Sequence, residues 1–188
     1  MKKLFLLLII CGLSSTAFSQ FLKKGSIIGG GSFQFQTTKY KDSDSKSHSL
    51  SIMPWAGYLI IDNLVLGTSF DISSSGSKSS GYKSSSNGIS VGPMVRYYLD
   101  QGLFFSGQYT FGSGKIKDDF TNSTTKFNYS IYRLGVGYAA RITDTVLLEP
   151  TIGYYGVSNG DNTYSGLNNN SSGLFISGGF TIILKNVQ

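Results

Sequence analysis

The fold class is decided by one stretch of the chain, VLLEPTIGYY at positions 146–155. Val146, Leu148 and Ile152 are bulky and apolar, and they alternate with a set that includes Glu149. Alternation with a period of two is typical of a β-strand that has one apolar face. The stretch therefore predicts a strand with bulky side chains on one side and mainly small or polar ones on the other.

The same alternation recurs in four further stretches, at 64–72, 90–99, 133–139 and 174–184. In each, one face is bulky and apolar, while the other carries glycine, serine and the charged residues. No stretch after Gln20 approaches the roughly 18 consecutive apolar residues that a membrane-spanning helix needs. We therefore predict an all-β chain.

The connections between these stretches alternate in length. Three are tight turns at 62–63, 100–102 and 143–144, and four are long and polar at about 39–48, 73–88, 113–126 and 158–172. Short turns at one end and long loops at the other are typical of outer-membrane barrels, and closure removes the unpaired strand edges that lipid does not tolerate. The layout predicts an eight-stranded antiparallel up-and-down transmembrane β-barrel.

The aromatic residues are expected to form two bands, as they do at the two interfaces of a bilayer. The band near the long loops comprises Phe33, Phe35, Phe70, Tyr109, Phe111, Tyr132 and Tyr154, and the band near the short turns comprises Tyr58, Tyr97, Phe105 and Tyr138.

Composition excludes several kinds of site. The sequence of 188 residues contains one cysteine and one histidine, which excludes a Cys/His zinc site and a disulfide framework. The formal charge of +6 comes from scattered basic residues, a distribution unlike that of a nucleic-acid interface. We expect no metal, no cofactor and no nucleic-acid partner.

The amino terminus reads as a secretory signal peptide. Lys2 and Lys3 precede an apolar run at 4–10, and small residues follow up to Ser19. We expect cleavage after residue 19, so that 20–188 forms the barrel domain. A lipoprotein signal at Cys11 is rejected because such signals have a small residue before the cysteine, whereas Ile10 stands here.

The last stretch carries a motif, SGGFTIIL at 177–184, of the pattern polar-x-Gly-x-x-apolar-x-apolar. Its pattern positions are Ser177, Gly179, Ile182 and Leu184. With the layout described above, it resembles the assembly signal of small outer-membrane barrels of the OmpX and OmpA-transmembrane-domain type, in their Bacteroidetes-like form. That family often ends on Phe or Tyr, whereas this chain has Leu184 and four further residues.

The resemblance implies a bacterial outer-membrane protein that the barrel-assembly machinery recognises. Its other partners would be outer-membrane lipid and lipopolysaccharide, and we expect a monomer. Lysines in three of the long connections offer contacts to lipopolysaccharide phosphates, although solvation alone also accounts for them.

If the bulky residues face lipid, the charged residues face the lumen, where unpaired ions are costly. The residues expected there are Gln34, Gln36, Asp71, Met94, Arg96, Gln108, Arg133, Arg141 and Glu149. Arg96 and Glu149 lie at similar heights above the short turns, so we predict that they pair, and that Asp71 pairs with Arg133 higher up. The favoured function is a structural or surface-interacting barrel whose lumen is filled by polar side chains. The alternative is a narrow porin-like channel gated by the charge pairs.

Two further alternatives remain. A lipid A-modifying barrel enzyme would draw on His48, Asp71 and Ser73, but a solvated histidine at a loop edge is the simpler interpretation, and we predict no enzyme. A secreted lipocalin-like barrel would turn its apolar residues inward. The Gly-x-Trp motif of lipocalin-like first strands is missing, because the single tryptophan is Trp55 and follows Pro54.

Overall fold

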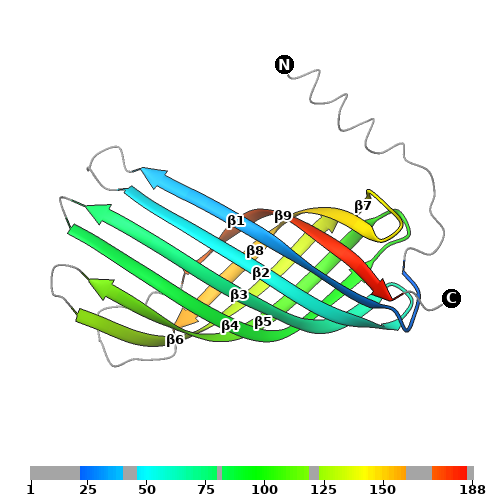
Figure 1. The fold of residues 1–188 in the computed structure, drawn as a ribbon, viewed down its shortest axis with the longest axis horizontal. Helices are drawn as coiled ribbons and strands as arrows, with labels where there is room; N and C mark the ends of the chain where they lie inside the picture. The colour runs from blue at the N-terminus through cyan, green and yellow to red at the C-terminus, as the bar shows by residue number, and fades with distance from the viewer. Residues whose placement is uncertain (1–21, 40–45, 80–81, 119–122, 160–170, 186–188) are drawn as a thin grey trace, which may run out of the picture.

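The computed structural model describes residues 22–39, 46–79, 82–118, 123–159 and 171–185, and these form one antiparallel sheet that closes on itself (Figure 1). Within these ranges no helix is long and apolar enough to cross a membrane. The strands are β1 (Ile27–Lys39), β2 (Lys46–Ile61), β3 (Leu64–Ser79), β4 (Tyr82–Tyr98), β5 (Leu103–Asp118), β6 (Ser123–Tyr138), β7 (Ala140–Arg141), β8 (Val146–Asn159) and β9 (Ser171–Lys185). The predicted signal peptide, at 1–19, lies outside the described residues.

The closed sheet has eight strands when β6 and β7 are counted as one, as the sequence predicts. β7 is a continuation of β6, because Gly137 lies opposite Thr151 and Ala140 lies opposite Leu148 in one unbroken register along β8. Neighbours in the sequence pair with each other, and β9 returns to pair with β1. The predicted eight-stranded antiparallel barrel is confirmed.

The predicted faces are also confirmed. On β8, Leu148, Ile152 and Tyr154 are exposed on the outer wall, whereas Glu149 is buried inside. The outer wall is apolar around the barrel, and we call its exposed aliphatic and aromatic side chains the outer belt. The lipocalin-like alternative, with a polar outer wall, is contradicted by this belt.

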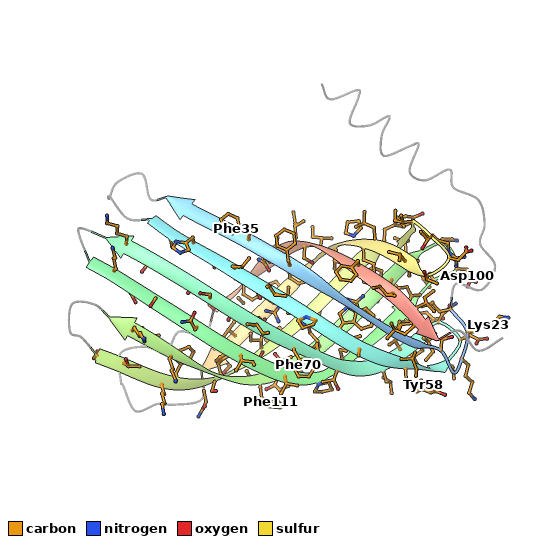
Figure 2. The ribbon with its side chains drawn as sticks, viewed as in Figure 1. Lys23, Phe35, Tyr58, Phe70, Asp100 and Phe111 are labelled. Carbon is orange, nitrogen blue, oxygen red and sulfur yellow. The ribbon has the colours of Figure 1, made fainter. Side chains whose placement is uncertain are left out.

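Aromatic residues of the outer belt lie at two levels. Figure 2 shows Tyr58 near the end with the short turns, and Phe70 and Phe111 further toward the opposite end. The upper set is exposed throughout, comprising Phe33, Phe35, Phe70, Tyr109, Phe111, Tyr132 and Tyr154. In the lower set, Tyr58, Tyr97 and Phe105 are exposed, and Tyr138 is half-buried.

The predicted long loops are wrong in extent. β3 continues to Ser79 and β4 begins at Tyr82, so most of 73–88 is strand, and β5 and β6 likewise take up most of 113–126. These segments are polar on both faces, which removes the alternation that marks a strand in the sequence. Their backbones nevertheless remain paired in register, and they form a polar extension of the barrel beyond the outer belt. Of the other two predicted loops, 46–48 and 158–159 are strand, and 171–172 begins β9.

At the end of the barrel that carries the short turns, Asn63 forms hydrogen bonds that link neighbouring segments. Its φ of 64° is left-handed, a conformation that asparagine tolerates better than most residues. The backbone N–H of Leu22 donates to Asn63 Oδ1 at 3.0 Å, and the Asn63 N–H donates to the carbonyl of Leu22 at 3.0 Å. Asn63 Nδ2 also donates to Asp100 Oδ1. The segment that precedes β1 is thereby held across this end.

A close approach of β4 and β5 requires glycine at position 92. Backbone pairing between the two strands skips Gly92 and Pro93, and Pro93 has no N–H to donate. A Cβ at Gly92 would lie 2.0 Å from the carbonyl oxygen of Tyr109. The two backbones would have to separate to admit any side chain.

We therefore expect Gly92→Ala to lower the free energy of unfolding by about 1–3 kcal/mol, as overpacking does in close-packed interiors. The matched control is Gly107→Ala on β5, where the nearest atoms to a Cβ are at an ordinary 3.5 Å. The control should be unchanged or more stable by up to about 1 kcal/mol. Denaturant titration in detergent micelles measures both variants. Equal stability of the two would refute the close approach at Gly92.

Candidate functional site

The middle of the lumen holds a polar layer in which four charged side chains meet. Arg96 on β4 and Glu149 on β8 form one ion pair, in which Nη1 donates to Oε2 at 2.5 Å. Arg133 on β6 and Asp71 on β3 form the other, in which Nη2 donates to Oδ2 at 2.5 Å. The alternation of each strand turns these four side chains inward. The structure thus brings together both pairs that the sequence suggests.

Each carboxylate has a second donor. The hydroxyl of Tyr98 donates to Glu149 Oε1 at 2.8 Å, and the hydroxyl of Ser51 donates to Asp71 Oδ1 at 2.7 Å. Both carboxylates are almost completely buried, with side-chain exposures of 2% and 3%. A buried ion pair becomes favourable only when its remaining polar atoms are hydrogen-bonded, and the oxygens of both carboxylates meet that condition.

Arg96 also lies between aromatic rings. Its guanidinium carbon is 4.2 Å from the centroid of Trp55 and 5.1 Å from that of Phe104. The rings of Tyr98 and Phe104 are themselves in contact, with centroids 5.3 Å apart. This aromatic cage adds cation–π attraction to the charge pair and holds the guanidinium in place.

Below the polar layer, toward the short turns, the lumen is filled by apolar side chains. Fully buried residues there include Ile28, Leu59, Val65 and Leu147. Leu22, from the segment before β1, belongs to the same cluster and is 3% exposed. The sequence analysis expected a polar interior and missed this core. An apolar filling avoids the cost of burying unpaired polar groups where the chain supplies no partners.

Between the ion pairs and β9 lies a small polar cavity of about 40 Å³, lined in part by Arg96, Arg133, Gln108 and Ser177. This volume is enough for no more than a few water molecules. One guanidinium nitrogen of Arg133, Nη1, has no hydrogen-bond partner among the described residues. Arg133, which lines the cavity, therefore has one hydrogen-bond donor without a partner among the described residues.

The other predicted lumen residues fall into three groups. Gln34, Met94 and Gln108 are partly or fully buried on the inner face. Arg141 lies opposite inward-facing Leu147 but is exposed, at the end of the barrel with the short turns. The side chain of Gln36 lies outside the described residues.

The residues of the assembly motif are divided between the inner and outer faces of β9. Ser177 is buried and Gly179 is partly buried on the inner face, whereas Ile182 and Leu184 are exposed on the outer belt. Recognition of this motif by the assembly machinery stays a prediction.

His48, Asp71 and Ser73, the residues of the enzyme alternative, do not come together in one site. His48 is exposed and lies opposite Gly76, in the outward register of β2 and β3. Asp71 points into the lumen, where Arg133 and Ser51 occupy its oxygens. The wall of the barrel therefore separates the histidine from the carboxylate. In the described part of the chain, no three His, Cys, Asp or Glu side chains lie close enough together to hold a metal ion.

Solved membrane barrels resemble this chain in fold at low sequence identity. The β-domain of the Bordetella autotransporter Brka aligns with a TM-score of 0.51 and 13% identity, over 84% of this chain and 69% of that one. Neisserial surface protein A aligns at 0.49 and 17% identity, over 86% and 98%. Ail, the attachment invasion locus protein of Yersinia pestis, aligns at 0.46 and 16%, over 85% and 99%. No protein-family model and no curated protein matches the sequence, so the likeness extends to the barrel fold alone.

We expect Arg96→Ala and Glu149→Ala each to lower the free energy of unfolding by about 3 kcal/mol or more, because each leaves a buried ion without its partner. The double variant should lose clearly less than the sum of the two, since the second substitution removes the ion that the first left unpaired. Denaturant titration of the four proteins in detergent micelles gives the coupling. Strict additivity would show that the contact contributes nothing to stability.

Proposed function

We propose that this chain is an integral outer-membrane β-barrel with a structural or surface-interacting role, and that its lumen is closed to solutes. The observation that carries the proposal is a closed sheet with an apolar outer wall and a filled interior. A continuous apolar surface of this extent is unfavourable in water and favourable in a bilayer.

Two successive layers of side chains, and the small size of the cavity between them, support a closed lumen. Leu22 and the apolar core fill the end with the short turns. The aromatic cage around Arg96 and the two ion pairs fill the middle. The cavity of about 40 Å³ in the polar layer is far smaller than a water-filled pore.

The narrow-channel alternative rests on the charges of the polar layer. Ions passing along the lumen would have to displace both ion pairs and then cross the apolar core. Each step exposes buried charge or wets an apolar core, so conduction requires a large rearrangement of the interior.

A heat-modifiability experiment tests the membrane barrel. Outer-membrane fractions are run on a detergent gel with and without boiling, and we expect the unboiled band to run at a shifted position. A closed barrel keeps its backbone hydrogen bonds internal and unfolds slowly in detergent until heated. A protein that shows no shift and collects in the soluble periplasmic fraction would overturn the proposal.

Planar-bilayer recording tests the closed lumen. We expect the purified barrel to insert without producing stepwise conductance, while a porin in the same bilayers produces it. A variant that combines Trp55→Gly, Phe104→Gly and Leu59→Gly should show short openings, because it removes the cage and part of the apolar core. Steady conductance by the unmodified protein would favour the channel instead.

A further inference from the structure

The outer wall over β3–β6 and β8 carries two adjoining hollows, of about 700 and 690 Å³. Ile89, Ser113 and Asn128 line both of them, so the two form one continuous depression, which we call the wall groove. It runs from the outer belt into the polar extension of the barrel. Its lower and upper halves differ in chemistry.

The lower half of the groove is apolar. Phe70, Val91 and Phe111 line it and are 43–59% exposed, in successive positions of one register row across β3, β4 and β5. Figure 2 shows Phe70 and Phe111 on the same side of the barrel. This row offers a lipid acyl chain a surface of the kind that the rest of the outer belt presents.

The groove is hollow because small side chains continue that row. Ser130 lies opposite Phe111 on β6, and Ser158 lies opposite Ser130 on β8. From inside the barrel, Tyr129 and Phe127 pack against Gly112 and Gly114, and a Cβ at Gly114 would lie 2.4 Å from the Phe127 ring. These rings back the wall, so the groove opens outward only.

The upper half of the groove is cationic. Lys115 on β5 lies opposite Lys126 on β6, and Lys117 lines the same hollow. Like charges directly opposite each other on neighbouring strands are destabilising. Among the described residues, the ion pairs are those of the lumen, and neither involves these lysines. An anion bound between Lys115 and Lys126 would remove the repulsion.

We propose that the wall groove binds a lipid that carries phosphate groups, with the phosphate between Lys115 and Lys126 and an acyl chain along Phe70, Val91 and Phe111. The site rests on the proposed function, because only a barrel in the membrane sets this wall against lipid. A free anion or an acidic peptide would leave the apolar half uncovered, whereas a phosphorylated lipid matches both halves. The lysines lie where the outer belt gives way to the polar extension, as a headgroup requires.

The experiment counts lipid molecules that remain bound to the purified barrel in detergent, by native mass spectrometry. The probes are lipid A, dephosphorylated lipid A, phosphatidylglycerol and inorganic phosphate. We expect lipid A to bind at one copy per barrel, and the other two lipids to bind more weakly. Lys115→Gln with Lys126→Gln should weaken lipid A binding about 30-fold, from about fivefold per lysine near a lipid phosphate.

The chain offers a matched control in Lys78→Gln with Lys83→Gln. These lysines also lie opposite each other on neighbouring strands, but four residues beyond the row of Asn87 and outside the groove. That displacement is about 13 Å along the strand, so lipid A binding should be unchanged. A second variant, Ser130→Phe, keeps every lysine and fills the lower half, and it should also weaken binding.

Three outcomes would contradict the proposed lipid site: equal losses in both lysine pairs, equal binding of phosphorylated and dephosphorylated lipid A, or binding of inorganic phosphate as tight as that of lipid A. Each variant is first checked for its heat-dependent shift on the gel. A shifting barrel that does not select lipid A defeats this inference alone. A chain that never shifts and stays soluble defeats the membrane proposal itself.

Discussion

The pairing of β1 with β9 is the interaction on which the rest of the structure depends. Every other junction joins strands that are neighbours in the sequence, and this one joins the two ends of the chain, with Ile28 opposite Ile183 and Gly31 opposite Phe180. Without it, two strands would present unpaired N–H and C=O groups along their whole length, which lipid does not tolerate. Closure also creates the lumen, and with it the need to neutralise whatever points inward.

Closure of the barrel brings inward-facing residues that are far apart in the sequence into one site. Asp71 and Arg133 are 62 positions apart in the sequence, and Arg96 and Glu149 are 53 apart, yet each pair meets across the lumen. Counting residues from the short turns was enough to match their heights, because strands of one barrel share a common rise and tilt. The supporting donors, Tyr98 and Ser51, follow the same inward parity.

The sequence was most informative where one face of a strand is apolar and the other is not. It predicted the closed barrel and both ion pairs. It failed on the polar extension, because strands such as 73–79 have serine on both faces and therefore lack the alternation that marks a strand. It also failed on the apolar core, because Leu147 and Val65 read as part of the same apolar runs as their outward neighbours. The wall groove could not be predicted from the sequence, because a hollow depends on the side chains of several neighbouring strands at one height.

The distribution of charge suggests where this barrel meets its surroundings. In the polar layer, two arginines are balanced by one aspartate and one glutamate, so that these four side chains contribute no net charge. The sequence as a whole is positive by six, and Lys78, Lys83, Lys115, Lys117 and Lys126 on the strands are exposed. The charges of the polar layer are thus neutralised within the lumen, whereas the charges of Lys115 and Lys126 lie on the outer wall and create a positive potential there. Under the proposal of a lipid site, selectivity resides on the outer wall, where Lys115 lies opposite Lys126.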